Sequence, residues 1–223
     1  MVVRVIRLGL LVTILCRAAE IDGNVLIQRR LTKRKIEVPV SSYERGVTVS
    51  PGAGPEADAL AFERTHVIVY LEGDLPSKLS DATMCQKNKM FMPDLLAVSA
   101  GSTVSFPNLD PIFHNVFSLS KAKEFDLGNY PKDKTRLVTF AKPGVIFVNC
   151  HLHPNMTAAI VVCPNSFNTR PDSAGRFALS GVPPGSYTIV AWHKTAGFFR
   201  HSITVTEGQP AAVQFVIPLL AGQ

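Results

Sequence analysis

The most informative stretch of the chain is Val-Asn-Cys-His-Leu-His-Pro-Asn-Met at residues 148–156. It places a thiol at Cys150, an imidazole three residues later at His153, and a thioether three residues further on at Met156. The apolar run 145–149 predicts a strand, so the three side chains follow on a tight loop at a strand end. Such a loop can direct all three toward one point. A thiolate, an imidazole and a thioether together suit copper in both of its oxidation states.

A trigonal copper site also needs a second imidazole, which has to come from another loop. Residues 110–117 read Asp-Pro-Ile-Phe-His-Asn-Val-Phe and supply His114, about 36 residues before the cysteine. The next residue, Asn115, is expected to donate its backbone N–H to the cysteine sulfur and so to tune the metal. Two histidines and a cysteine with a weak axial methionine define a blue-copper electron-transfer site. The predicted metal ligands are His114, Cys150, His153 and Met156.

Two alternatives concern this ligand set. His151 is an extra imidazole directly after the cysteine, and its side chain starts on the opposite side of an extended strand end. It is predicted to be a surface or supporting residue, although it could take the place of His153. Zinc is the competing metal, because two histidines and a cysteine with an open fourth position also suit zinc. A methionine at the axial position, Met156, favours copper.

The region around these residues resembles the cupredoxins, most closely the plastocyanin and amicyanin group. Residues 91–104 read Phe-Met-Pro-Asp-Leu-Leu-Ala-Val-Ser-Ala-Gly-Ser-Thr-Val, similar to the F-x-P-x-x-x-x-V-x-x-G-x-T-V motif of that group. A His-Asn-Val loop follows, with Phe113 where the group has a proline, and the closing Cys-x2-His-x2-Met spacing is short, as in amicyanin. The resemblance covers about residues 82–163. It implies a Greek-key β-sandwich with one mononuclear type 1 copper site and a protein redox partner.

A second module follows at residues 172–192, which read Asp-Ser-Ala-Gly-Arg-Phe-Ala-Leu-Ser-Gly-Val-Pro-Pro-Gly-Ser-Tyr-Thr-Ile-Val-Ala-Trp. This pattern predicts two strands with tight turns at Gly175 and at the Pro-Pro-Gly of 183–185. It resembles the signature of carboxypeptidase-regulatory-like, transthyretin-like β-sandwiches, which implies a structural or docking domain without chemistry. The combination is similar to bacterial proteins labelled methylamine-utilisation proteins, a label that does not establish methylamine metabolism.

The order of the motifs predicts that the second sandwich is split. Its type normally opens with a Gly-x-Val strand and a Val-x-Val strand, and matches to both lie far upstream, at 23–27 and 67–71. We therefore expect residues 20–81 to hold its N-terminal strands and a loop, 82–163 to form an inserted cupredoxin copper domain, and 164–223 to complete the sandwich. Surface loops accept such insertions at modest entropic cost. The alternative is a linear order, with a short independent tail domain after the cupredoxin.

The chain as a whole predicts an all-β protein of two sandwiches. Short apolar or alternating runs are separated by Gly, Pro, Asn and Asp, and runs such as 67–69 should be covered on both faces. Helix is expected only at 56–63. The candidate strands are 24–28, 66–71, 95–98, 103–106, 136–140, 145–149, 158–162, 176–179, 186–191, 202–206 and 212–217.

Residues 1–19 predict a signal peptide and export to the periplasm. Arg4 and Arg7 precede the apolar run 8–16, and two small residues at 18–19 suit cleavage. A membrane-spanning helix needs about 20 apolar residues, and this run is shorter. No stable membrane insertion of the mature chain is therefore expected. The alternative is that the leader stays on the chain as an uncleaved membrane anchor. Cleavage removes three arginines and no acid, which lowers Lys+Arg from 23 to 20 against 17 acids. The resulting charge of +3 does not favour nucleic-acid binding.

Two cysteines lie outside both the leader and the predicted site. Cys85 and Cys163 either form a disulfide in an oxidising compartment or remain separate buried thiols. A basic cluster at 29–35 is either a solvated loop or a docking patch for an acidic partner.

Electron transfer without enzymatic turnover is the expected function, because the four ligands leave no open position for a substrate. Two other functions remain: a copper-binding structural or delivery module, and a zinc-stabilised adhesion domain.

Overall fold

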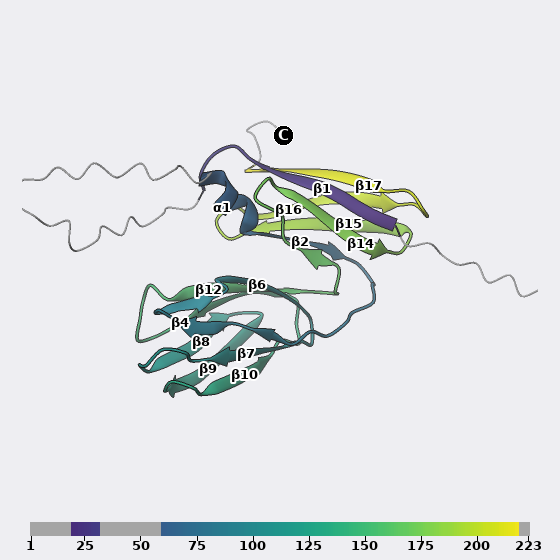
Figure 1. Ribbon diagram of the computed structural model, residues 1–223. Coiled ribbons are helices and arrows are strands. Elements are labelled where there is room, and N and C mark those ends of the chain that lie inside the picture. The colour runs from purple at the N-terminus through teal and green to yellow at the C-terminus, as the bar shows by residue number, and fades with distance from the viewer. Residues whose placement is uncertain (1–18, 32–58, 219–223) are drawn as a thin grey trace, which may run out of the picture.

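The computed structural model describes residues 19–31 and 59–218, and it forms two β-sandwiches stacked on each other (Figure 1). The all-β class predicted from the sequence is confirmed. Nearly all of the predicted leader and part of the basic cluster lie outside the described residues. Among the described residues, no helix combines the length and the apolar character needed to cross a membrane.

The sandwich drawn at the top of Figure 1, here called the upper sandwich, consists of β1, β2 and β13 to β17. One of its sheets is built around the first described strand. β1 (Ala19–Ile27) lies between β14 (Arg176–Val182), to which it is antiparallel, and β17 (Ala211–Ile217), to which it is parallel. A side chain at Gly23 of β1 would clash with the ring of Phe177 on β14, so the glycine leaves room for that ring. One contact therefore explains two motif residues: Gly23 of the Gly-x-Val strand and Phe177 of the motif at 172–192.

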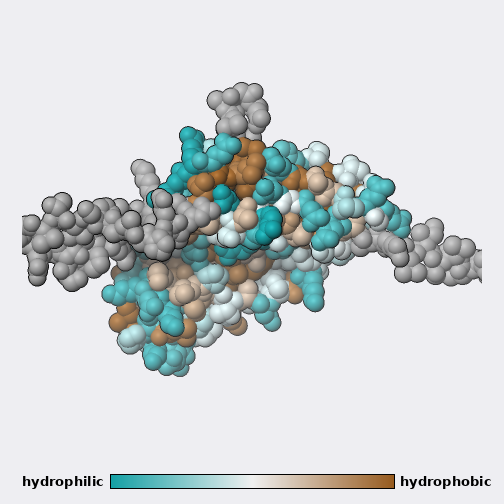
Figure 2. All heavy atoms as spheres, turned by 45° about the horizontal axis from the view of Figure 1, so that its top comes forward, coloured by the Kyte–Doolittle hydropathy of each residue, from teal (hydrophilic) through white to brown (hydrophobic). Residues whose placement is uncertain are grey.

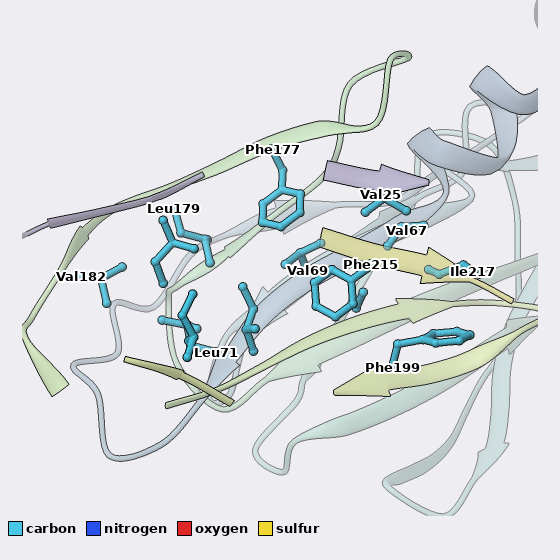
Figure 3. Packing of buried hydrophobic residues seen from close by; sticks show 14 of the residues in the cluster. Val25, Val67, Val69, Leu71, Phe177, Leu179, Val182, Phe199, Phe215 and Ile217 are labelled. Carbon is cyan, nitrogen blue, oxygen red and sulfur yellow. The ribbon is translucent and has the colours of Figure 1, made fainter. Parts of the chain in front are cut away.

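The other sheet of this sandwich has the order β13-β2-β15-β16. Its strands are β13 (Asn168–Thr169), β2 (Val67–Glu72), β15 (Gly185–His193) and β16 (Gly197–Val205). Figure 3 shows Val25, Phe177, Leu179 and Phe215 of the first sheet and Val67, Val69 and Leu71 of the second in the space between the two sheets. The core of this sandwich is thus made by chain segments from both ends of the described sequence. α1 (Ala59–Thr65) precedes β2 and is tied to the sandwich by Glu63, which binds His193 on β15 at 3.0 Å.

The lower sandwich is made entirely by the segment between these two parts. Its sheets have the orders β10-β7-β3 and β6-β12-β11-β8-β9, with a separate hairpin, β4-β5. The strands are β3 (Ala82–Thr83), β4 (Cys85–Lys87), β5 (Met90–Met92), β6 (Leu95–Ser99), β7 (Thr103–Pro107), β8 (His114–Ser120), β9 (Lys123–Tyr130), β10 (Thr135–Thr139), β11 (Gly144–Asn149) and β12 (Thr157–Cys163). Side chains of these strands and of the loops between them form a second core that includes Phe106, Phe140, Ile146 and Met156.

A third buried cluster joins the two sandwiches, and β2 shows how it arises. Val67 and Val69 face the core of the upper sandwich, whereas Ile68 and Tyr70 face the lower one. The prediction that this apolar run is covered on both faces is therefore confirmed. The cluster consists of Ile68, Tyr70, Val190 and Trp192 from the upper sandwich and Leu95, Ala159, Val161 and Cys163 from the lower one. The face drawn in Figure 2 mixes hydrophilic and hydrophobic residues over both sandwiches, with one hydrophobic group on the upper sandwich.

Most predicted strands lie within a few residues of the observed ones, and the differences have physical causes. The helix occupies Ala59–Thr65 instead of 56–63, of which residues 56–58 lie outside the described part. The strands that were not predicted are the short β3, β4, β5 and β13 and the longer β8 and β9. β9 alternates half-exposed and exposed residues and carries three charged side chains, so it has no apolar run to reveal it. Cys85 and Cys163 are free thiols, so the disulfide is absent; of the two buried thiols expected as the alternative, Cys163 is buried but Cys85 is partly exposed.

Candidate metal centre

The candidate ligands meet because β8 and β11 are antiparallel neighbours, so the start of β8 lies beside the end of β11. β8 begins at His114, and β11 ends one residue before Cys150. Asn149 of β11 pairs with Phe117 of β8, which brings the start of one strand beside the end of the other. The loop after Cys150 then turns back, with the Met156 amide donating to the His153 carbonyl at 2.8 Å.

Three of the four predicted ligand residues direct donor atoms at one point. The Nδ1 atoms of His114 and His153 are 3.1 Å apart, and the Cys150 sulfur lies 4.0 Å and 3.7 Å from them. A trigonal metal with bonds of about 2.0–2.1 Å to nitrogen and about 2.3 Å to sulfur needs separations of about 3.5 Å between nitrogens and about 3.8 Å between sulfur and nitrogen. The three atoms therefore fit a metal ion.

The fourth predicted ligand, Met156, is placed at the same end of the lower sandwich. Its side chain is 1% exposed and packs in the same buried cluster as Cys150, which is 4% exposed. His114 is fully buried, so His153 is the one member of the four that is partly exposed.

Asp110 fixes the orientation of the first histidine. Its Oδ2 lies 2.8 Å from Nε2 of His114, so a proton on Nε2 leaves the Nδ1 lone pair free for the metal. Burial alone would raise the pKa of Asp110, but the amides of Lys89 and Asn88 and the His114 ring donate to the carboxylate and hold its pKa below the usual range. Asp110 lies four positions before His114 in the sequence, but no motif indicates its role, because the contact depends on the loop conformation.

Asn115 connects the two loops of the centre. Its backbone N–H donates to the Cys150 sulfur at 3.4 Å, as predicted from the sequence. Its side-chain oxygen accepts from the His151 amide at 3.4 Å, and its side-chain nitrogen donates to Asp126 at 2.6 Å. One residue therefore contacts the cysteine sulfur and also holds the backbone that follows it.

His151 lies outside the group of converging donor atoms. Its ring stacks on Phe117, with centroids 3.6 Å apart and planes 5° apart, and its Nε2 lies 3.6 Å from an Asp126 oxygen. The side chain is exposed and turned away from the centre onto β8 and β9.

The electrostatic setting of His153 favours the neutral ring that can bind a metal. Burial, and then the nearby His114 and Lys89, lower the pKa of His153. The remaining histidines have other contacts: His193 is buried against Glu63, His66 lies 3.2 Å from Asp94, and the His201 ring lies beside that of Phe215. Among the described residues, His114, Cys150 and His153 are the one group of three or more histidine, cysteine or acidic side chains that could hold a metal.

Comparisons with known proteins find similarity in part of the chain. No family model matches it, and no curated protein matches it. A copper-containing nitrite reductase (NirK) from Thermus scotoductus SA-01 is 24% identical over 41% of this chain and 23% of its own, with a TM-score of 0.35. A purple cupredoxin from Nitrosopumilus maritimus is 22% identical over 36% of this chain and 98% of its own, with a TM-score of 0.33. A reduced amicyanin mutant is 20% identical over 42% of this chain and 97% of its own, with a TM-score of 0.35.

Proposed function

We propose that the chain is an exported, mononuclear type 1 copper protein that transfers electrons with a protein partner in the periplasm. The observation that carries the proposal is the convergence of the Cys150 sulfur with the Nδ1 atoms of His114 and His153. Copper bound there would supply a Cu(II)/Cu(I) couple for one-electron transfer. The buried thioether of Met156 is the proposed weak axial donor, the member of the set that distinguishes copper from zinc.

The residues around the centre support electron transfer because hydrogen bonds from outside the ligand set hold two of them in place. Asp110 orients His114, and the Asn115 N–H stabilises the Cys150 thiolate. A centre whose ligands are held by such contacts is expected to change little between two oxidation states, which favours fast electron transfer. His153 is the partly exposed member of the set and is the proposed port through which electrons pass to a partner.

Substrate turnover is not part of the proposal. Cys150, His114 and Met156 are all buried, which leaves a substrate little access to the centre except past His153. We propose that the upper sandwich is of the carboxypeptidase-regulatory-like type and serves as a docking or structural domain. A delivery or structural role for the copper, and a zinc-stabilised adhesion domain, are the competing functions.

The visible spectrum of the purified protein separates these functions. With one equivalent of Cu(II), an electron-transfer centre of this type is expected to show intense visible absorption from thiolate-to-copper charge transfer. A colourless protein that binds copper only as Cu(I) would support the delivery role instead, and stoichiometric zinc in the protein as isolated would support the adhesion role.

The two loop histidines are expected to respond differently to replacement. His153→Ala removes an atom 3.7 Å from the Cys150 sulfur and should strongly weaken or abolish the visible band, whereas His151→Ala removes only a ring stacked on Phe117. The absorption spectra of the two copper-loaded variants measure this directly. Loss of the band in His151→Ala together with its retention in His153→Ala would show that the assignment of the two residues is reversed.

A further inference from the structure

The β4-β5 hairpin has a feature that the proposed centre does not use. Cys85 pairs with Met92, Gln86 with Phe91, and Lys87 with Met90. Asn88 and Lys89 form the two-residue turn, both with positive φ (55° and 56°), as a tight type I′ hairpin turn requires. The register of the hairpin is therefore fixed, and so is the set of side chains on each of its faces.

Three sulfur-containing side chains start from the outer face of this hairpin. Gln86 and Phe91 are buried, whereas Met90 is 51% exposed and Met92 is 44% exposed. Directly opposed residues of antiparallel strands point to the same face, with Cβ atoms about 4.5–5.5 Å apart, and diagonal neighbours are within reach of long side chains. Cys85, a partly exposed free thiol, is thus beside Met92 and diagonal to Met90.

We propose that Cys85, Met90 and Met92 form a second copper site, selective for Cu(I), on the surface of the lower sandwich. Thioether and thiolate ligands select Cu(I) over harder metals. Binding replaces the Cys85 thiol proton by the metal and releases that proton to solvent. The two thioethers coordinate without any proton change, and no electron is transferred.

The surroundings of the hairpin fit a metal site better than a random apolar surface. The turn is anchored by Asp110, whose oxygens accept from the Asn88 and Lys89 amides at 2.7 Å and 2.8 Å, so the donor atoms start from a rigid backbone. A pocket of about 370 Å³ beside Met90 and Met92 gives a hydrated ion access to the two thioethers. Lys87 lies on the same face, and its positive charge repels a cation. The affinity for Cu(I) therefore has to come from the sulfur donors.

The same pocket is lined by Asn155 and Thr157, the neighbours of Met156 in the sequence. The proposed surface site therefore lies beside the loop that carries the buried centre. The proposal does not depend on the proposed electron-transfer function, because none of its three donors belongs to that centre.

An anaerobic titration of the metal-free full chain with Cu(I), in competition with a Cu(I) chelator, tests the second site. The wild type is expected to bind two equivalents, and the Met90→Leu/Met92→Leu variant one, because leucine keeps the apolar surface and removes the sulfur. Cys85→Ser is expected to lose the same equivalent. NMR of methionines labelled in the methyl group should show the Met90 and Met92 signals shifting with Cu(I) and remaining in place with Zn(II).

Lys87→Gln is the matched control, since it changes the same face without removing a sulfur, and it should still bind two equivalents. If the buried centre takes no copper, the wild type would bind one equivalent and the double methionine variant none, so the two proposals fail separately. Methionine signals that stay unshifted at two equivalents of Cu(I), or a double variant that binds as much Cu(I) as the wild type, would overturn the second site.

Discussion

Cys150→Ser is expected to abolish the visible absorption of the copper-loaded protein while leaving both sandwiches folded. The band requires a sulfur-to-copper charge transfer, and a hydroxyl cannot supply it. Serine has nearly the volume of cysteine, and the Asn115 N–H that donates to the sulfur at 3.4 Å can donate to the hydroxyl oxygen. The stability cost should stay at about 1–3 kcal/mol, the range for one disturbed buried hydrogen bond. Absorption spectra and thermal unfolding of both proteins measure the two effects.

Cys163→Ser provides a matched control for this experiment. Cys163 is also a buried thiol of the lower sandwich, but it packs between the two sandwiches, where burial raises its pKa to about 12 and keeps it protonated. Its replacement should leave the visible band unchanged. A band that survives in Cys150→Ser, or that disappears in Cys163→Ser, would contradict the assignment of the thiolate ligand.

Parts of the fold with a strong local pattern could be predicted from the sequence. β12 and β2 are continuous apolar runs, and each is covered on both faces, as such runs require. β9 was harder to recognise, because one side of it is open to solvent and its apolar residues Phe125 and Leu127 stand singly between charged and polar ones. Pairing partners were harder still: that β1 lies between β14 and β17 depends on residues more than 150 positions apart.

The candidate site divides in the same way. Cys150, His153 and Met156 could be identified because their spacing lies within one loop, and His114 because it precedes Asn115 in a recognisable segment. Asp110 gave no such signal, since its contact with the His114 ring and with the hairpin turn exists only after the loops have folded. The stacking of His151 on Phe117 likewise joins a loop residue to β8, a contact that the sequence does not reveal.

Residues 164–223 alone are expected to remain unfolded, which is the central test of the proposal that the segment 82–163 is inserted into a split sandwich. This fragment keeps β14 and β17 but lacks β1, the strand that lies between them. It also lacks β2, the interior strand between β13 and β15. Both sheets of the upper sandwich would lose a central member, and a strand without a partner leaves a row of backbone N–H and C=O groups unpaired.

The lost core is large compared with the stability of a small domain. β1 and β2 contribute six side chains to the core of the upper sandwich that are at most 3% exposed: Ile21, Val25, Ile27, Val67, Val69 and Leu71. Burial of one such side chain contributes about 1.5–3 kcal/mol, so the six together contribute about 9–18 kcal/mol. A whole domain is stable by only about 5–15 kcal/mol. The fragment therefore cannot hold the native sandwich.

Two complementary proteins complete the test. Residues 82–163 alone should fold and take up copper, because their core contains only residues of that segment. Residues 20–76 joined to 166–223 through a short Gly/Ser linker should regain a cooperative, β-rich fold. That protein would expose Ile68, Tyr70 and Trp192, which normally face the lower sandwich, so polar replacements at Ile68 and Tyr70 should improve its solubility without lowering its melting temperature much. Circular dichroism during heating measures all three proteins. A cooperative melting transition of 164–223 on its own would instead establish the linear domain order.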